Sequence, residues 1–104
     1  MFNINGEDWR VLLVSPNHPS LLKSDGFYTI GVCDDNTKTI YINETLNDKY
    51  FKKVLCHEIT HAAMFSYNIE LNLEQEELLA DLIATYGQEI IHITNLLFKR
   101  IQEK

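Results

Sequence analysis

The pattern of apolar and polar residues predicts three extended segments in the first half of the chain. Three stretches rich in β-branched and aromatic residues predict strands: 9–14, 26–32 and 38–43. Residues 15–25 hold both prolines and predict a loop, and residues 1–7 predict a loose or edge segment. The Asp and Asn residues of 33–37 favour a tight turn, so the second and third strands should form an antiparallel hairpin.

Two longer stretches repeat apolar residues at helical spacing and predict helices, over 48–66 and 73–100. Asn47 or Thr45 is a suitable N-cap for the first helix, and Asn72 with Gln75 has the spacing of a capping box before the second. The first helix is apolar over a wide arc, which predicts a central, mostly buried position. In the second helix, several apolar residues are expected to face the core: Leu78, Leu79, Leu82, Ile83, Ile90, Ile91, Leu97 and Ile101.

These elements predict an α+β fold, in which a small antiparallel sheet of about three strands packs on the first helix and on the long C-terminal helix. The length of 104 residues predicts one domain, 1–104. Gly87 indicates a kink or a close helix contact within the last helix. The apolar surface of that helix is compatible with core burial and equally with a dimer, so the oligomeric state is left open.

The charge and composition exclude several classes of partner. A net charge of −6 with scattered Lys and Arg argues against nucleic acid, because phosphate binding needs a clustered basic face. The chain has neither an apolar run of about 20 residues nor a signal-peptide pattern. We therefore expect a cytoplasmic location without membrane association. Cys33 and Cys56 are too few for a disulfide framework and are expected to be reduced.

The candidate chemistry lies in His57-Glu58-Ile59-Thr60-His61, which has the spacing H-E-x-x-H. Two histidines four residues apart share one face of a helix, with Cβ atoms roughly 5–6 Å apart, so both imidazoles can reach one metal ion. Glu58 follows the first histidine directly and points aside, where it can hold a metal-bound water. This is the pattern of a zinc peptidase whose glutamate acts as general base.

A catalytic zinc needs a third protein ligand, which should come from the last helix. The acidic candidates are Glu74, Glu76, Glu77 and Asp81. An antiparallel return of the chain brings Glu77 near the level of the histidines, and Asp81 lies on the same helix face. Asp81 could then accept the outer N–H of a ligand histidine. Glu74 and Glu76 are expected to be solvated acids that suit the helix dipole.

The H-E-I-T-H motif followed by Glu-Leu-Leu-Ala-Asp resembles the glutamate zincins, and the small size resembles the ImmA/IrrE-type minimal zincins of phages and mobile elements. The resemblance covers about residues 26–90. It implies Zn2+ bound by His57, His61 and Glu77, with Asp81 as the partner of a ligand and Glu58 as catalytic acid/base.

The function that follows is zinc-dependent hydrolysis of a peptide or protein substrate, in which zinc-bound water attacks the carbonyl and Glu58 takes its proton. A second oxyanion donor could be Tyr67, Tyr86 or His92, although each is more often a packing residue. An extended substrate could pair with the strand at 38–43. Two alternatives stay open: a catalytically inactive zincin-fold protein-binding module and a structural zinc domain.

Overall fold

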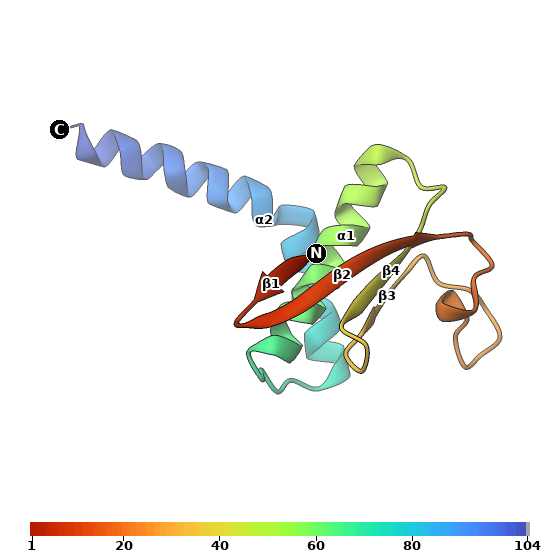
Figure 1. The fold of residues 1–104 in the computed structure, drawn as a ribbon. Coiled ribbons are helices and arrows are strands. Elements are labelled where there is room, and N and C mark those ends of the chain that lie inside the picture. The colour runs from red at the N-terminus through yellow and green to blue at the C-terminus, as the bar shows by residue number, and fades with distance from the viewer. Residues whose placement is uncertain (104) are drawn as a thin grey trace.

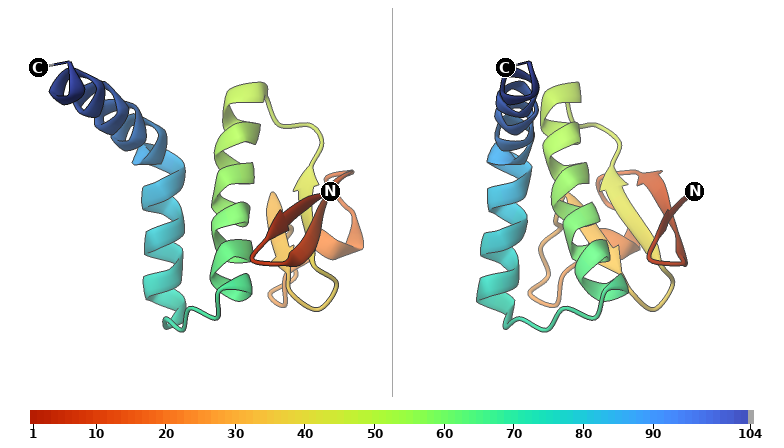
Figure 2. Two further views of the ribbon diagram at one scale, coloured as in Figure 1. Left: turned by 60° about the vertical axis from the view of Figure 1, so that its left-hand side comes forward. Right: turned by 90° about the vertical axis from the view of Figure 1, so that its left-hand side faces the viewer.

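Helix α1 (Asp48–Ser66) lies between a four-stranded sheet and helix α2 (Leu73–Gln102) in the computed structural model, which describes residues 1–103 (Figure 1). Figure 2 shows these three layers from two sides, with α1 in the middle. The predicted α+β class is confirmed, and so are the two helices with their N-caps. The Asn47 side chain accepts a hydrogen bond from Tyr50 N, and Asn72 forms a capping box with Gln75.

The sheet is mixed and has the order β1-β2-β4-β3. Its strands are β1 (Phe2–Ile4), β2 (Glu7–Val14), β3 (Gly31–Asp34) and β4 (Thr39–Asn43). The predicted hairpin is present as the antiparallel pair β3–β4, but β4 also pairs in parallel with β2. The expectation of three antiparallel strands was therefore wrong in strand number and in direction.

The fourth strand arises from a tight turn at Asn5-Gly6. Both residues have positive φ, +50° and +82°, which is the backbone that a two-residue hairpin turn requires. The turn pairs β1 with β2 in an antiparallel ladder. Asn-Gly is a strong hairpin signal, so this strand could have been found from the sequence.

Strand β3 begins later than predicted, at Gly31 rather than at residue 26. The preceding residues leave the sheet, form an isolated bridge between Leu22 and Tyr28, and place a 3-10 turn (Pro19–Leu21) against β3 and β4. Leu21 is fully buried there. This loop therefore covers the sheet around β4, which explains why both faces of that strand are largely buried.

The core lies between the sheet and α1, and it is built from Trp9, Ile40, Ile42, Val54 and Ala62. Burial of each large side chain stabilises the fold by roughly 1.5–3 kcal/mol. Trp9 also donates a 2.8 Å hydrogen bond from Nε1 to the Ser66 hydroxyl, which ties β2 to the last turn of α1. Helix α1, which carries the H-E-x-x-H motif, is thus fixed at its C-terminal end by a buried hydrogen bond as well as by packing.

The first half of α2 returns antiparallel to α1, but about midway the helix bends and its second half leads away from α1 (Figure 2). Among its described residues α2 buries only Ala80. The expectation that its apolar residues face the core was therefore wrong for Leu78, Leu82, Ile83, Ile90, Ile91, Leu97 and Ile101, all of which are exposed. No helix within residues 1–103 is long and apolar enough to cross a membrane.

Candidate metal centre

Two histidines on one face of α1 turn their rings toward a common point. The Nε2 atoms of His57 and His61 lie 3.1 Å apart, and the rings meet edge to face at a centroid distance of 4.9 Å. The helical spacing of four residues accounts for this convergence. His61 is buried and His57 is partly buried, and both border a cavity.

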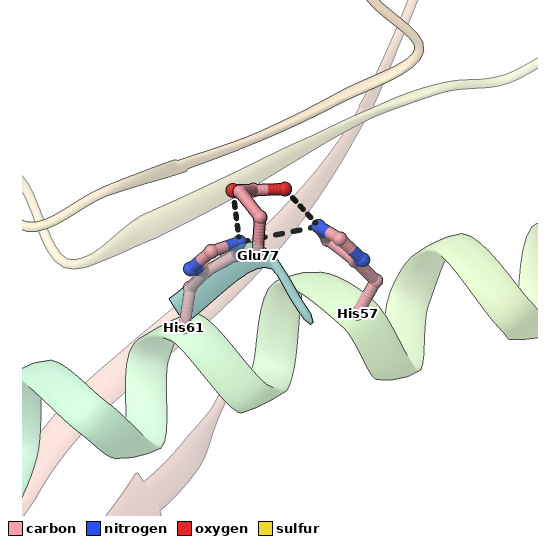
Figure 3. A group of neighbouring side chains, drawn as sticks. All are labelled: His57, His61 and Glu77. Atoms are coloured by element: carbon pink, nitrogen blue, oxygen red, sulfur yellow. Dashed lines mark hydrogen bonds and ion pairs between the residues drawn. The ribbon is translucent and has the colours of Figure 1, made fainter. Parts of the chain in front are cut away.

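Glu77 of α2 places its carboxylate over the same point (Figure 3). Glu77 Oε2 lies 3.3 Å from His57 Nε2, and Oε1 lies 3.0 Å from His61 Nε2. The structure therefore brings together the three residues that the sequence led us to consider as metal ligands. One potential ligand atom can be chosen from each of the three residues so that the three atoms lie within 4.8 Å of one another.

The spacing of these atoms fits a zinc ion. A tetrahedral zinc with ligand bonds of about 2.0–2.2 Å places its ligand atoms roughly 3.3–3.6 Å apart. The two Nε2 atoms lie 3.1 Å apart, and each lies 3.0 or 3.3 Å from a different oxygen of the Glu77 carboxylate, which is close to that value. Two imidazoles and one carboxylate also form the ligand set of known catalytic zinc sites, which leave the fourth position open.

Each imidazole also has a carboxylate next to its other ring nitrogen, Nδ1. Asp81 Oδ1 lies 3.0 Å from His57 Nδ1, and Glu76 Oε1 lies 2.7 Å from His61 Nδ1. A carboxylate at Nδ1 favours the tautomer that carries its proton there. The lone pair of each ring is then on Nε2, the atom that faces Glu77.

The charge pattern that results needs a cation. With both Nδ1 atoms protonated, the two Nε2 lone pairs and the Glu77 carboxylate all converge as hydrogen-bond acceptors. Acceptors packed about 3 Å apart repel one another unless a positive charge lies between them. The donor chemistry of the site therefore fits a divalent metal ion.

The outcome for Glu76 differs from the expectation. It was predicted to be a solvated acid, but its side chain is only 19% exposed and contacts a motif histidine. Glu74, in contrast, is exposed. The pattern of an acid directly before Glu77 could have pointed to Glu76, since adjacent helical residues reach different sides of a facing helix.

Glu58 is buried against β3. Glu58 is only 6% exposed. A Cβ atom added at Gly31 would lie 3.1 Å from Glu58 Oε2 and 2.8 Å from Val54 Cγ1. The absence of a side chain at Gly31 thus lets the strand approach the carboxylate closely. Burial raises the pKa of Glu58, and protonation of His57 or His61 would oppose that rise.

A cavity of about 720 Å³ opens beside the three ligand candidates and Glu58. Its wall includes Gly31 and Val32 of β3, and Tyr50 and Lys53 from the first half of α1. The three residues considered as oxyanion donors do not line it: Tyr67 and Tyr86 are about half exposed elsewhere and His92 is exposed. Tyr50, two helical turns before His57, was missed because only residues after the motif were considered.

Comparison with known proteins now decides the family. A family model described as the IrrE N-terminal-like domain, a family of peptidases, matches residues 10–92. The chain belongs to the IrrE N-terminal-like domain family. The predicted resemblance to ImmA/IrrE-type minimal zincins is thereby confirmed, and the family favours a metallopeptidase-type function. No curated protein and no solved structure matches the chain. For this IrrE-like domain, the roles of individual residues therefore rest on the geometry above.

Proposed function

We propose that the protein is a zinc-dependent peptidase that hydrolyses a peptide bond with Glu58 as general base. The proposal is carried by one observation: three acceptor groups, His57 Nε2, His61 Nε2 and the Glu77 carboxylate, converge with each imidazole about 3 Å from one carboxylate oxygen. The buried Glu58 carboxylate and a cavity adjoin them. Membership of a peptidase family supports the same conclusion.

A zinc ion held there would supply a Lewis acid for the peptide carbonyl and would lower the pKa of water to about 7. Glu58 accepts the proton of the attacking water and passes it to the amine nitrogen as the C–N bond breaks. The raised pKa of Glu58, which results from burial, suits a group that must both take and return a proton near neutral pH. Asp81 and Glu76 keep the two imidazoles in the orientation that binding requires.

The substrate is proposed to bind along β3. The sequence suggested the strand at 38–43 for this role, but β4 is paired on both sides, with β2 and with β3, so its backbone edges are occupied. Within the described chain β3 ends the sheet, and Gly31 and Val32 line the cavity. An extended peptide added to this edge would pass directly in front of Glu58.

Tyr50 is proposed as the second donor to the developing oxyanion, because it is a tyrosine that lines the cavity. Its hydroxyl can donate a hydrogen bond that strengthens as charge forms on the carbonyl oxygen. We expect Tyr50→Phe to lower kcat by about tenfold or more while zinc content stays unchanged. An unchanged kcat would exclude this role.

The decisive experiment measures zinc content and cleavage together. Purified wild type should carry one zinc per chain and cleave members of a fluorogenic peptide library, and a chelator should abolish cleavage. Glu58→Gln should keep its zinc and lose roughly 10²–10⁴-fold in rate. The matched control is Glu44→Gln, at an exposed acid outside the site. Retained cleavage in Glu58→Gln would refute the role given to Glu58.

The same measurements separate the alternatives. A structural zinc closes its coordination with four protein ligands, whereas this site offers three and borders a large cavity, which disfavours a purely structural role. A wild-type chain that binds zinc but cleaves no library member would instead favour the inactive protein-binding module.

A further inference from the structure

The second half of α2 presents a broad apolar surface, here called the C-terminal apolar face. Every described residue from position 88 onward is exposed. The large apolar residues of the face are between 43% and 67% exposed: Tyr86, Ile90, Ile91, Ile93, Leu96, Leu97, Phe98 and Ile101. Single exposed apolar residues are ordinary, but a contiguous group of this size marks an interaction surface.

The face has a defined direction on the helix. At 100° per residue, these apolar side chains span an arc of roughly 220° centred near Ile90 and Leu97. The remaining strip is polar and contains Gln88, His92, Asn95 and Lys99. A helix with so wide an apolar arc is normally covered by other protein. The stretch Ile90–Phe98 without charged residues is too short to span a bilayer, which takes about 20.

The amount of uncovered surface can be compared with that of a compact monomer. The chain exposes 7544 Å², whereas a folded monomer of 12.1 kDa is expected to expose about 6,000 Å². The excess is about 1,500 Å². The radius of gyration also indicates an extended shape, because it is 15.8 Å, whereas about 13 Å is expected for a compact domain of this length.

That excess is larger than the share that one partner contributes to a stable complex, which is roughly 800 Å². We propose that the protein is a homodimer in which the C-terminal apolar faces of two copies pair antiparallel about a two-fold axis. The proposal is independent of the proposed peptidase function, because it uses no residue of the metal centre.

The spacing of the face suits pairing with itself. About a two-fold axis between positions 93 and 94, Ile90 meets Leu97 of the second copy, and Tyr86 meets Ile101. Every contact is then made twice, as an isologous interface requires. The second half of α2 leads away from α1 in each copy (Figure 1). Because only these halves overlap in the proposed dimer, the two metal centres would lie at its opposite ends.

Charges at the two ends favour the antiparallel direction. Glu89 precedes the uncharged stretch and Arg100 follows it, and both lie on the same flank of the face at 100° per residue. Antiparallel pairing places Glu89 of one copy beside Arg100 of the other at both ends of the interface. Parallel pairing about a two-fold axis would instead place the two equivalent flanks on opposite sides of the interface, so Glu89 and Arg100 would gain no charged partner there.

Sedimentation equilibrium of the full chain tests the dimer. We expect twice the chain mass of 12.1 kDa for wild type. Leu97→Glu should give the monomer mass, since two buried carboxylates would oppose pairing. The matched control, Asn95→Glu, lies on the polar strip and should remain dimeric. Leu97 is half exposed in one copy, so zinc content and circular dichroism should not change. A monomeric wild type at its highest soluble concentration would overturn the proposal.

A charge exchange tests the direction of pairing. Glu89→Arg and Arg100→Glu should each raise the dimer dissociation constant several-fold, and the double variant should recover wild-type affinity. In a parallel dimer these two side chains would lie on opposite sides of the interface from their counterparts, so each single exchange would leave the affinity unchanged. A double variant no tighter than either single one would overturn the antiparallel arrangement.

Discussion

Glu76 Oε1 lies 2.7 Å from His61 Nδ1, on the side of the imidazole opposite the nitrogen that faces Glu77. Two neighbouring carboxylates of α2 thus contact the two nitrogens of one ring. One is placed to bind the metal directly, and the other orients the histidine that binds it. Asp81 contacts His57 Nδ1 in the same way. Both histidines are therefore oriented by carboxylates of α2 that contact their Nδ1 atoms.

Removing the charge behind His61 should weaken metal binding. We expect Glu76→Gln to lower zinc affinity by roughly 10–100-fold, because the outer carboxylate fixes the tautomer and raises the basicity of the ligand. Competition with a coloured chelator measures this. Glu74→Gln, two residues earlier at an exposed position, should leave the affinity unchanged. Equal affinities for the two variants would show that the contact with His61 is incidental.

The close approach of β3 to Glu58 should not tolerate a methyl group. Gly31→Ala places a Cβ 2.8 Å from Val54 Cγ1 and 3.1 Å from Glu58 Oε2, so the strand or the carboxylate must move. We expect a loss of roughly 1–3 kcal/mol in unfolding free energy. Peptidase activity should fall more than tenfold, while zinc content stays near one per chain.

Gly87→Ala serves as the control for Gly31→Ala. An added Cβ at Gly87 meets only Ile83, at 3.3 Å, and alanine favours the helix by roughly 0.5–1 kcal/mol. Full activity in both alanine variants would show that the Gly31 contact does not position Glu58.

The buried carboxylate should make the metal-free protein sensitive to pH. Because burial raises the pKa of Glu58 above its ordinary 4.5, the folded state binds this proton more tightly than the unfolded state. Stability of the metal-free chain should therefore fall as pH rises from 4.5 through the raised pKa. We expect metal-free Glu58→Gln to melt higher than metal-free wild type at pH 7. This difference should shrink toward pH 4, and equal melting temperatures at pH 7 would contradict the cause given.

Cys33 should resist alkylation in the folded protein. Burial, with smaller contributions from Glu58 and Asp35, raises its pKa from 9.0 to about 12. The reactive thiolate is then scarce at pH 8.5, so iodoacetamide should modify Cys33 many-fold more slowly in the native chain than in denaturant. Peptide mapping by mass spectrometry checks this. Equal rates in the two states would show that Cys33 is not shielded.

Much of the candidate site was predictable because it depends on local geometry. The pitch of a helix puts His57 and His61 on one face, and the Asn47 and Asn72 caps mark where the two helices begin. The return of α2 along α1 then makes Glu77 a natural third group. These features need only contacts within a helix or across one short connection.

The features that sequence reasoning missed depend on residues distant along the chain. The parallel pairing of β2 with β4 is decided by how the loop after β2 packs across the sheet, which no local pattern encodes. Likewise the contact of Glu76 with His61 depends on the rotation of α2 about its axis. The proximity of Gly31 to Glu58 depends on the layer spacing between sheet and helix.

The positions of the helices and of the metal-binding residue types along the chain follow from the amino-acid pattern, because backbone pitch and capping act over a few residues. Which acids reach the histidines and which apolar residues are buried depends on how the distant segments pack together. In α2 the same apolar periodicity continues beyond the bend, where the helix leads away from α1 and no other part of the described chain, residues 1–103, covers it. The periodicity of apolar residues indicates which face of a helix is hydrophobic, whereas the packing of the whole chain decides what covers that face.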